Sequence, residues 1–225
     1  MQFTQLSQNY QELVSIAQQY IPKDDPAHDR GHVGRVLTNC LYIAKHEGGD
    51  LDVIVAAALF HDVVNYPKND PRASQSTNES AQFAVNILKE LTWYPAQKIP
   101  NVEYCITHCS FSKNLSHDTL ESKVLQDADF LESIGAISLM RTFTSGGKTN
   151  RTLMHPTVPF PIGRDTDPHH YSFDLIRHRL LKIEDRMLTR TGKDLAKQRT
   201  EFLNAFVEQV KKELIILDNT LLLSK

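Results

Sequence analysis

The stretch from Leu51 to Val64 constrains the fold more than any other, because it is apolar on nearly all sides. It is rich in alanine and too long for a typical strand, so it predicts a central helix that is buried on most of its faces. A helix of this kind needs other elements packed around it. We therefore expect it to form the core of the domain.

Apolar residues recur at helical spacing along most of the remaining chain. These patterns predict helices over residues 6–17, 32–44, 81–91, 96–109, 122–142, 172–187 and 194–217. Gly48 and Gly49 close the second of these helices, and Ser76 or Thr77 is the candidate cap of the third. No run shows the period-two alternation of a half-buried strand. The sequence thus predicts an all-α fold.

One long segment, from Thr144 to Pro168, contains three glycines and four prolines. In a compact domain such a segment is typical of a lid or a binding loop. The length of 225 residues is close to that of one large domain. We therefore expect a single domain over residues 1–225, with its core at about residues 25–142 and C-terminal helices at about residues 172–217.

Composition excludes several classes of protein. The 25 Lys and Arg residues nearly balance the 27 Asp and Glu residues, so no strong field attracts a nucleic-acid polymer or an anionic membrane. The longest apolar run, residues 53–60, is far shorter than the roughly 20 residues of a membrane span, and the N-terminus lacks the pattern of a signal peptide. Three cysteines indicate reduced thiols. We expect a cytosolic protein with no nucleic-acid or membrane partner, and a homodimer stays open.

Polar side chains interrupt the apolar patterns at three places. His61 and Asp62 end the buried helix, His32 lies on the apolar face of the preceding helix, and Asp127 shares a face with apolar neighbours. Each has an ordinary explanation alone: a capped helix end, a hydrogen-bonded core histidine, and a salt bridge to an arginine. Together, two imidazoles and two carboxylates make a donor set for a divalent metal, with positions left for water and a substrate oxygen.

The order H…HD…D, carried by His32, His61, Asp62 and Asp127, resembles the HD-domain superfamily of metal-dependent phosphohydrolases, which is all-helical. Five stretches are similar to a bacterial subgroup of small stand-alone HD hydrolases: HDRGHVGRV (28–36), FHDVVNYPK (60–68), HCSFS (108–112), QDADFLESIGA (126–136) and MLTRTGK (187–193). Phe130 stands where this subgroup more often has arginine. The resemblance implies an HD-domain-like helical bundle, with the Gly/Pro-rich loop before the C-terminal helices.

The resemblance also implies a ligand set and a mechanism. One divalent metal ion (Mn, Fe, Co, Ni or Mg) would be held by His32, His61, Asp62 and Asp127, and hydrolysis at phosphorus would use water that the metal activates. Catalytic roles would fall to Asp62, Lys68 and His108. The candidate substrate contacts are His28, Asn65, Lys68, Arg72 and Lys113. Arg72, Lys113 and Lys68 are equally explained as surface charges, and Asn65 as a helix cap.

Two further patterns have structural interpretations. Arg35, one turn from His32, is expected to pair with a buried acid. Cys105 and Cys109 share a helical face with His108, but zinc would need a fourth ligand, so we interpret the two cysteines as packing residues.

We therefore expect a phosphohydrolase that cleaves a phosphoanhydride or phosphate ester of a small phosphorylated compound, in particular a nucleotide. The alternative is a catalytically silent regulatory HD module that binds a nucleotide or a metal. Such a module is expected to lose a ligand, whereas all four candidate positions carry ligating side chains here, which favours catalysis. A third hypothesis, an all-α interaction protein without a site, predicts that chelation leaves stability unchanged.

Overall fold

The computed structural model describes residues 7–21, 30–66, 70–110 and 115–222. These residues form helices and no strand, and one isolated parallel bridge joins Thr152 to Tyr171. The α-helices are α1 (Gln8–Tyr20), α2 (Arg30–Glu47), α3 (Leu51–Phe60), α4 (Ser76–Glu90), α5 (Ile99–His108), α6 (Leu120–Phe130), α7 (Ala136–Lys148), α8 (Asp174–His178) and α9 (Arg190–Leu222). The short 3-10 helices are η1 (Pro71–Gln75), η2 (Ala96–Lys98), η3 (Leu131–Ser133), η4 (Leu180–Lys182) and η5 (Glu184–Arg186). The prediction of an all-α fold is confirmed.

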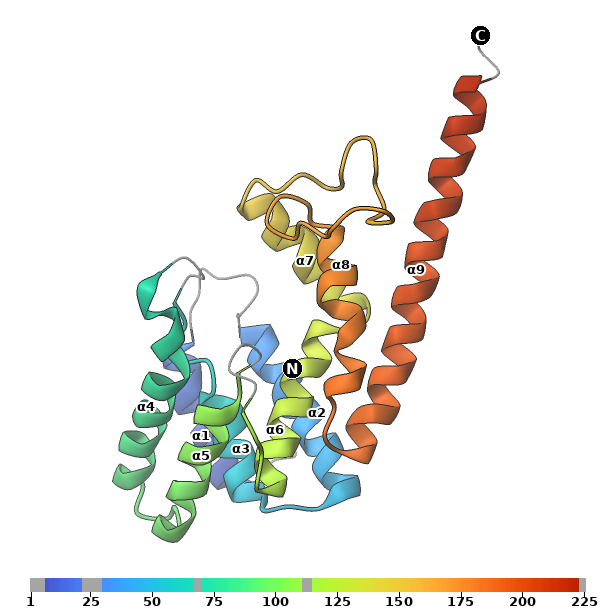
Figure 1. The fold of residues 1–225 in the computed structure, drawn as a ribbon. Coiled ribbons are helices and arrows are strands. Elements are labelled where there is room, and N and C mark those ends of the chain that lie inside the picture. Colours follow the sequence, from blue (N-terminus) through green and yellow to red (C-terminus); the bar gives the residue numbers. More distant parts are fainter. Residues whose placement is uncertain (1–6, 22–29, 67–69, 111–114, 223–225) are drawn as a thin grey trace. The chain divides into compact units, whose positions relative to one another are not determined.

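Helix α3 is the core element that the sequence predicts. Each residue from Val53 to Phe60 is at most 3% exposed, and the helix packs against α1, α2, α4, α5 and α6 (Figure 1). The helix begins after Asp50, whose side chain accepts a hydrogen bond from the backbone amide of Asp52, and it ends at Phe60 rather than at Val64. Because α3 is surrounded by other helices, the residues that follow it begin inside the protein.

The chain divides into two compact units. The first comprises Met1–Glu132 and Met187–Lys193, and the second comprises Ser133–Arg186 and Asp194–Lys225. The assignment of residues 1–225 to a single domain stays a prediction. Among the described residues, no helix has both the length and the apolar character that a membrane crossing requires.

The prediction of one continuous helix over residues 122–142 is wrong, because the helix is interrupted in the middle. Helix α6 ends at Phe130 and α7 begins at Ala136, after Gly135 with a φ of +87°. This left-handed conformation breaks the helix and suits glycine. Helix α7 then continues to Lys148, through Gly146 and Gly147, where the sequence predicts a loop. A Cβ at Gly146 would overlap the Ser172 hydroxyl, so this glycine serves close packing and not a turn.

Two other expectations are also corrected. The helix predicted over residues 172–187 is α-helical only in α8 and continues as η4 and η5. Neither Ser76 nor Thr77 caps α4, since the helix already begins at Ser76 and the cap position, Gln75, makes no side-chain hydrogen bond to it. The Ser76 hydroxyl instead accepts a hydrogen bond from the backbone amide of Tyr66 and so anchors the preceding loop.

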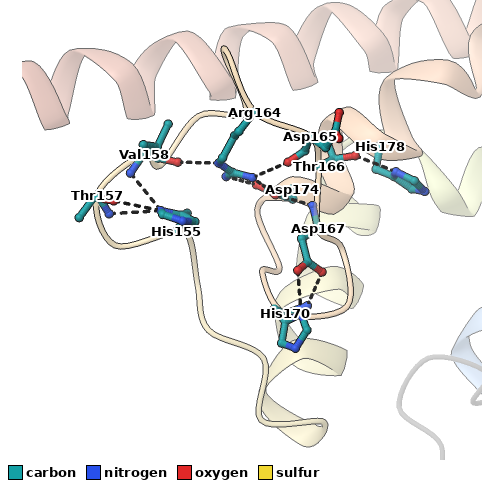
Figure 2. A network of polar contacts seen from close by, with 10 residues as sticks. All are labelled: His155, Thr157, Val158, Arg164, Asp165, Thr166, Asp167, His170, Asp174 and His178. Carbon is teal, nitrogen blue, oxygen red and sulfur yellow. Dashed lines mark hydrogen bonds and ion pairs between the residues drawn. The ribbon is translucent and has the colours of Figure 1, made fainter.

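A polar network holds the Gly/Pro-rich loop against α8 (Figure 2). The Arg164 guanidinium donates through Nη1 and Nη2 to the Asp174 carboxylate, at 2.5 and 2.8 Å, and through Nε to the Val158 carbonyl. Asp174 is completely buried and also accepts a hydrogen bond from the Asp167 amide. Burial alone would raise the pKa of Asp174, but these donors outweigh it and hold the pKa below its ordinary value. A buried ion pair therefore holds the loop against α8.

Replacing Arg164 by leucine would leave the Asp174 carboxylate buried without its cation. We expect the free energy of unfolding to fall by about 3 kcal/mol, as for other buried pairs that lose one partner. The control is Glu208→Gln, which removes the exposed pair between Glu208 and Lys211 and should cost less than about 1 kcal/mol. Chemical denaturation measures both values, and equal losses would contradict the role of the Arg164–Asp174 pair.

Candidate metal centre

Four polar side chains from α2, the end of α3 and α6 meet in the first unit. His32 Nε2 lies 3.4 Å from Asp62 Oδ2 and 3.5 Å from Asp129 Oδ1. His61 Nε2 lies 3.5 and 4.0 Å from the same two oxygens. Ligand atoms bound about 2.1 Å from one ion are roughly 3 to 4 Å apart, so these spacings fit a single divalent ion. We call these four residues the HHDD cluster.

Burial differs between the two kinds of side chain in the HHDD cluster. The imidazoles of His32 and His61 are buried, whereas the carboxylates of Asp62 and Asp129 are 24% and 26% exposed. The histidines thus close the inner side of the cluster and the carboxylates face solvent. Water and a substrate can reach this outer side, which a hydrolytic site requires.

The orientation of His61 provides a test of whether a metal fits. Its Nδ1 lies 2.8 Å from the carbonyl oxygen of Ala58, so we assign the proton to Nδ1 and a lone pair to Nε2. Nε2 is buried, and within the described part of the chain it has no hydrogen-bond partner. A lone pair that faces two carboxylate oxygens is unfavourable unless a cation lies between them. The donor set therefore fits a divalent ion.

Electrostatics around His32 agree with a cation site. Burial disfavours a charged imidazole, but the carboxylates of Asp62 and Glu132 outweigh this effect and raise the pKa of His32 to about 9. A bound metal ion takes the place of such a proton. Glu132 is itself buried, and it pairs with Arg35 at 2.7 Å, which confirms the expected ion pair of Arg35 with a buried acid. Although burial opposes ionisation of Glu132, His32 and Arg35 hold its pKa below the ordinary value.

The expectation that Asp127 joins the histidines is corrected, because Asp129 lies there instead. Asp127 is completely buried, and its carboxylate accepts hydrogen bonds from the Leu188 amide at 2.9 Å and from the Thr189 amide and hydroxyl at 2.7 and 2.6 Å. A Cβ at Gly192 would overlap the same carboxylate. Asp127 thus binds the start of α9, where a negative charge is favoured by the helix dipole.

Solvent exposure is the signal that distinguishes the two aspartates. The apolar neighbours of Asp127 correctly indicate that it points inward, but residues two apart on a helix diverge by about 200°. A ligand that must also face water and substrate is not completely buried, and Asp129 shares its intermediate exposure with Asp62. The sequence analysis also missed Glu132. It predicts that Arg35 pairs with a buried acid, but it does not identify Glu132 as that acid.

The remaining candidate residues have the following surroundings. His108 ends α5, where its ring stacks on Tyr104 with 3.9 Å between centroids and its Nδ1 lies 2.8 Å from the Tyr104 carbonyl oxygen. Asn65 is half-buried in the segment after Asp62. Arg72 is exposed, pairs with Asp70 at 2.9 Å and lies over the Tyr66 ring. The other candidates, His28, Lys68 and Lys113, lie outside the described residues.

All three cysteines are free and buried, in agreement with the interpretation of Cys105 and Cys109 as packing residues. Burial raises the pKa of Cys105 to about 12 and also raises the pKa of Cys40 and Cys109 well above the ordinary range. The negative charges of Asp129 and Asp62 raise the pKa of Cys109 further. These thiols are therefore poor nucleophiles in the folded protein.

Comparisons with known proteins show which families and structures the chain is similar to. A family model described as "HD domain" matches residues 30–134. The chain is 29% identical over 211 residues to YpgQ of Bacillus subtilis, covering 91% of this chain and 93% of YpgQ. The crystal structure of YpgQ in complex with ADP has a TM-score of 0.69 at 27% identity, with 91% of this chain and 97% of that chain covered.

Two further solved structures are similar along nearly the whole chain. An HD-superfamily hydrolase from Bacillus thuringiensis has a TM-score of 0.71 at 28% identity, and the match covers 92% of this chain and 96% of that chain. A protein from Listeria innocua has a TM-score of 0.67 at 30% identity, with 92% and 98% covered.

The cysteine environment generates a prediction about thiol reactivity. We expect the native protein to react slowly with Ellman's reagent, and the rate to stay low from pH 7 to pH 9. An ordinary cysteine, with a pKa of about 8.5, ionises over this range, whereas a raised pKa keeps a thiol protonated. Absorbance follows the reaction, and the unfolded protein serves as the control that releases all three equivalents. A rapid, stoichiometric reaction of the native protein would contradict the burial of these side chains.

Proposed function

Since the chain belongs to the HD superfamily, we propose that it is a metal-dependent phosphohydrolase that acts on a small phosphorylated compound, in particular a nucleotide. The observation that carries the proposal is the HHDD cluster, whose nitrogen and oxygen atoms have the spacing of ligands around one ion. The similar Bacillus thuringiensis protein is an HD-superfamily hydrolase, and YpgQ binds ADP in its crystal. The first fact favours a hydrolase, and the second favours a nucleotide or a related phosphate as the ligand.

His32, His61, Asp62 and Asp129 would hold the ion, with Asp129 in the place that the sequence assigns to Asp127. A divalent ion such as Mn, Fe, Co, Ni or Mg would supply a water of lowered pKa and polarise a phosphoryl oxygen. The buried histidines bind from the inner side and exclude water there. Asp62 and Asp129 both face the histidines and solvent, and we assign to Asp62 the acceptance of a proton from the attacking water, as the family resemblance implies.

The phosphate charge also requires cations and hydrogen-bond donors from the protein. We propose Lys68 as the main cation, together with Lys113, Arg72, His28 and Asn65 as substrate contacts and His108 as a catalytic group, as the family resemblance implies. Arg72 would have to exchange its local partner, Asp70, for the phosphate. The cleaved bond is a phosphoanhydride or a phosphate ester.

A pair of variants separates the roles of the two aspartates on α6. Asp129→Asn removes a proposed ligand, and we expect the affinity for Mn²⁺ to fall more than about tenfold, beyond what changes around the ligands alone produce. Asp127→Asn weakens the anchoring of α9, so it should lower the free energy of unfolding by about 1–3 kcal/mol and leave the Mn²⁺ affinity nearly unchanged. Calorimetric titration of the chelator-treated proteins and denaturation measure these effects. The opposite pattern would restore Asp127 as the ligand.

The reaction is tested with a panel of nucleotides and phosphate esters, each assayed for released phosphate and pyrophosphate with several divalent metals. We expect hydrolysis of at least one compound, its loss on chelation, and a decrease of at least about 100-fold in Asp62→Ala, because the variant loses both a ligand and a proton acceptor. Circular dichroism confirms that the variant is folded. Full activity of Asp62→Ala, or hydrolysis that persists after chelation, would refute the proposal.

A further inference from the structure

Glu132 is a carboxylate that the fold buries beside the HHDD cluster. It lies in η3, three residues after Asp129, and is 2% exposed. Burial of a charge is costly unless cations or hydrogen-bond donors surround it. Two neighbours from α2, Arg35 and His32, help to meet this requirement.

Both neighbours approach the same oxygen atom. Arg35 Nε lies 2.7 Å from Glu132 Oε2, and His32 Nδ1 lies 3.5 Å from it. Arg35 and His32 are three residues apart on α2 and therefore share one face of this helix. The carboxylate is thus held by the guanidinium while it faces the imidazole nitrogen that points away from the HHDD cluster.

The two histidines of the cluster are oriented in the same way by different groups. Each directs Nε2 towards Asp62 and Asp129 and turns Nδ1 to an acceptor. For His61 the acceptor is the backbone carbonyl of Ala58 at 2.8 Å, whereas for His32 the group that faces Nδ1 is the Glu132 carboxylate, at an ion-pair distance of 3.5 Å. An imidazole that binds a metal through Nε2 keeps its proton on Nδ1, and an acceptor at Nδ1 fixes the ring and raises the basicity of Nε2.

An ion pair with Arg35 alone does not account for this placement. The Arg35 side chain is 29% exposed and can be solvated, and a surface pair contributes at most about 1 kcal/mol. A carboxylate that served only Arg35 would be less costly at the surface, whereas Glu132 is buried with its oxygen towards the ring of His32.

We propose that Glu132 is a positioning residue that holds the proton of His32 on Nδ1 and directs Nε2 to the metal ion, while Arg35 holds the carboxylate in place. The inference rests on the proposed function, in which the HHDD cluster binds a divalent ion. Glu132 acts through His32 and is assigned no contact with the substrate.

The test compares Co²⁺ binding to three chelator-treated variants with binding to the wild type, by calorimetry and by the visible spectrum of the bound ion. Glu132→Gln replaces the charged acceptor by a neutral and weaker amide oxygen, so it should weaken binding by about 10- to 100-fold and change the spectrum, as changes behind a ligand do elsewhere. Arg35→Gln retains the acceptor, so it should lower the melting temperature and weaken binding less than about tenfold. The matched control is Glu121→Gln on α6, whose carboxylate accepts hydrogen bonds from Asp50 and Asn101. It should change stability and leave both the affinity and the spectrum as in the wild type.

The outcomes separate this inference from the proposed function. Wild-type protein that binds no Co²⁺ would overturn both. Tight wild-type binding that Glu132→Gln leaves unchanged, or that Glu132→Gln and Arg35→Gln weaken equally, would overturn the role of Glu132 alone.

A measurement on the unmodified chain decides the question if Glu132→Gln does not fold. Nitrogen-15 spectra of histidine-labelled protein loaded with Zn²⁺ report which ring nitrogen carries the proton. Because metal binding through Nε2 already places the proton of His32 on Nδ1, the deciding readout is the chemical shift of that proton. We expect the downfield shift of a proton shared with a carboxylate, and an unshifted Nδ1 proton, or a proton on Nε2, would overturn the inference.

Discussion

Two imidazoles that face two carboxylates in the interior impose the main constraint on this structure. His32 and His61 are buried, and each directs Nε2 to oxygens of Asp62 and Asp129 at 3.4–4.0 Å. Such a group of polar atoms is costly in a protein core unless a cation compensates it. The surrounding helices allow this arrangement because α3, buried from Val53 to Phe60, ends immediately before His61. The core that stabilises the first unit therefore also positions the residues of the site.

The two histidine ligands are oriented by different kinds of group, one by a backbone carbonyl and the other by side chains. The α3 backbone orients His61 through the Ala58 carbonyl, so the last turn of this helix fixes one ligand without any further residue. The ring of His32 contacts side chains from α6 and η3, namely those of Asp129 and Glu132. The half-exposed aspartates complete the cluster on its outer side. Rigid elements thus hold the inner ligands, whereas solvent reaches the outer ones.

The sequence predicts the elements whose burial pattern is strong, and it fails where geometry depends on close contacts. The central helix, the all-α fold, the inward histidines and the ion pair of Arg35 follow from apolar spacing and from the cost of isolated charges. Asp127 and Asp129 carry the same functional group, and the packing of α6 decides that Asp129 meets the histidines while Asp127 meets the Leu188 and Thr189 amides. Glycine is similarly ambiguous: Gly135 breaks a helix through a positive φ, whereas Gly146 lies within a helix and allows close packing.

One intervening residue, Ala128, separates the aspartate that anchors the start of α9 from the aspartate beside the histidines. An α-helix turns by about 100° per residue, so inserting or deleting a single residue at this point would rotate one carboxylate out of its place whichever end of α6 stayed fixed. The first unit is thereby intolerant of length changes over this short stretch of α6. An insertion or deletion between these two aspartates would therefore disrupt either the anchoring of α9 or the HHDD cluster.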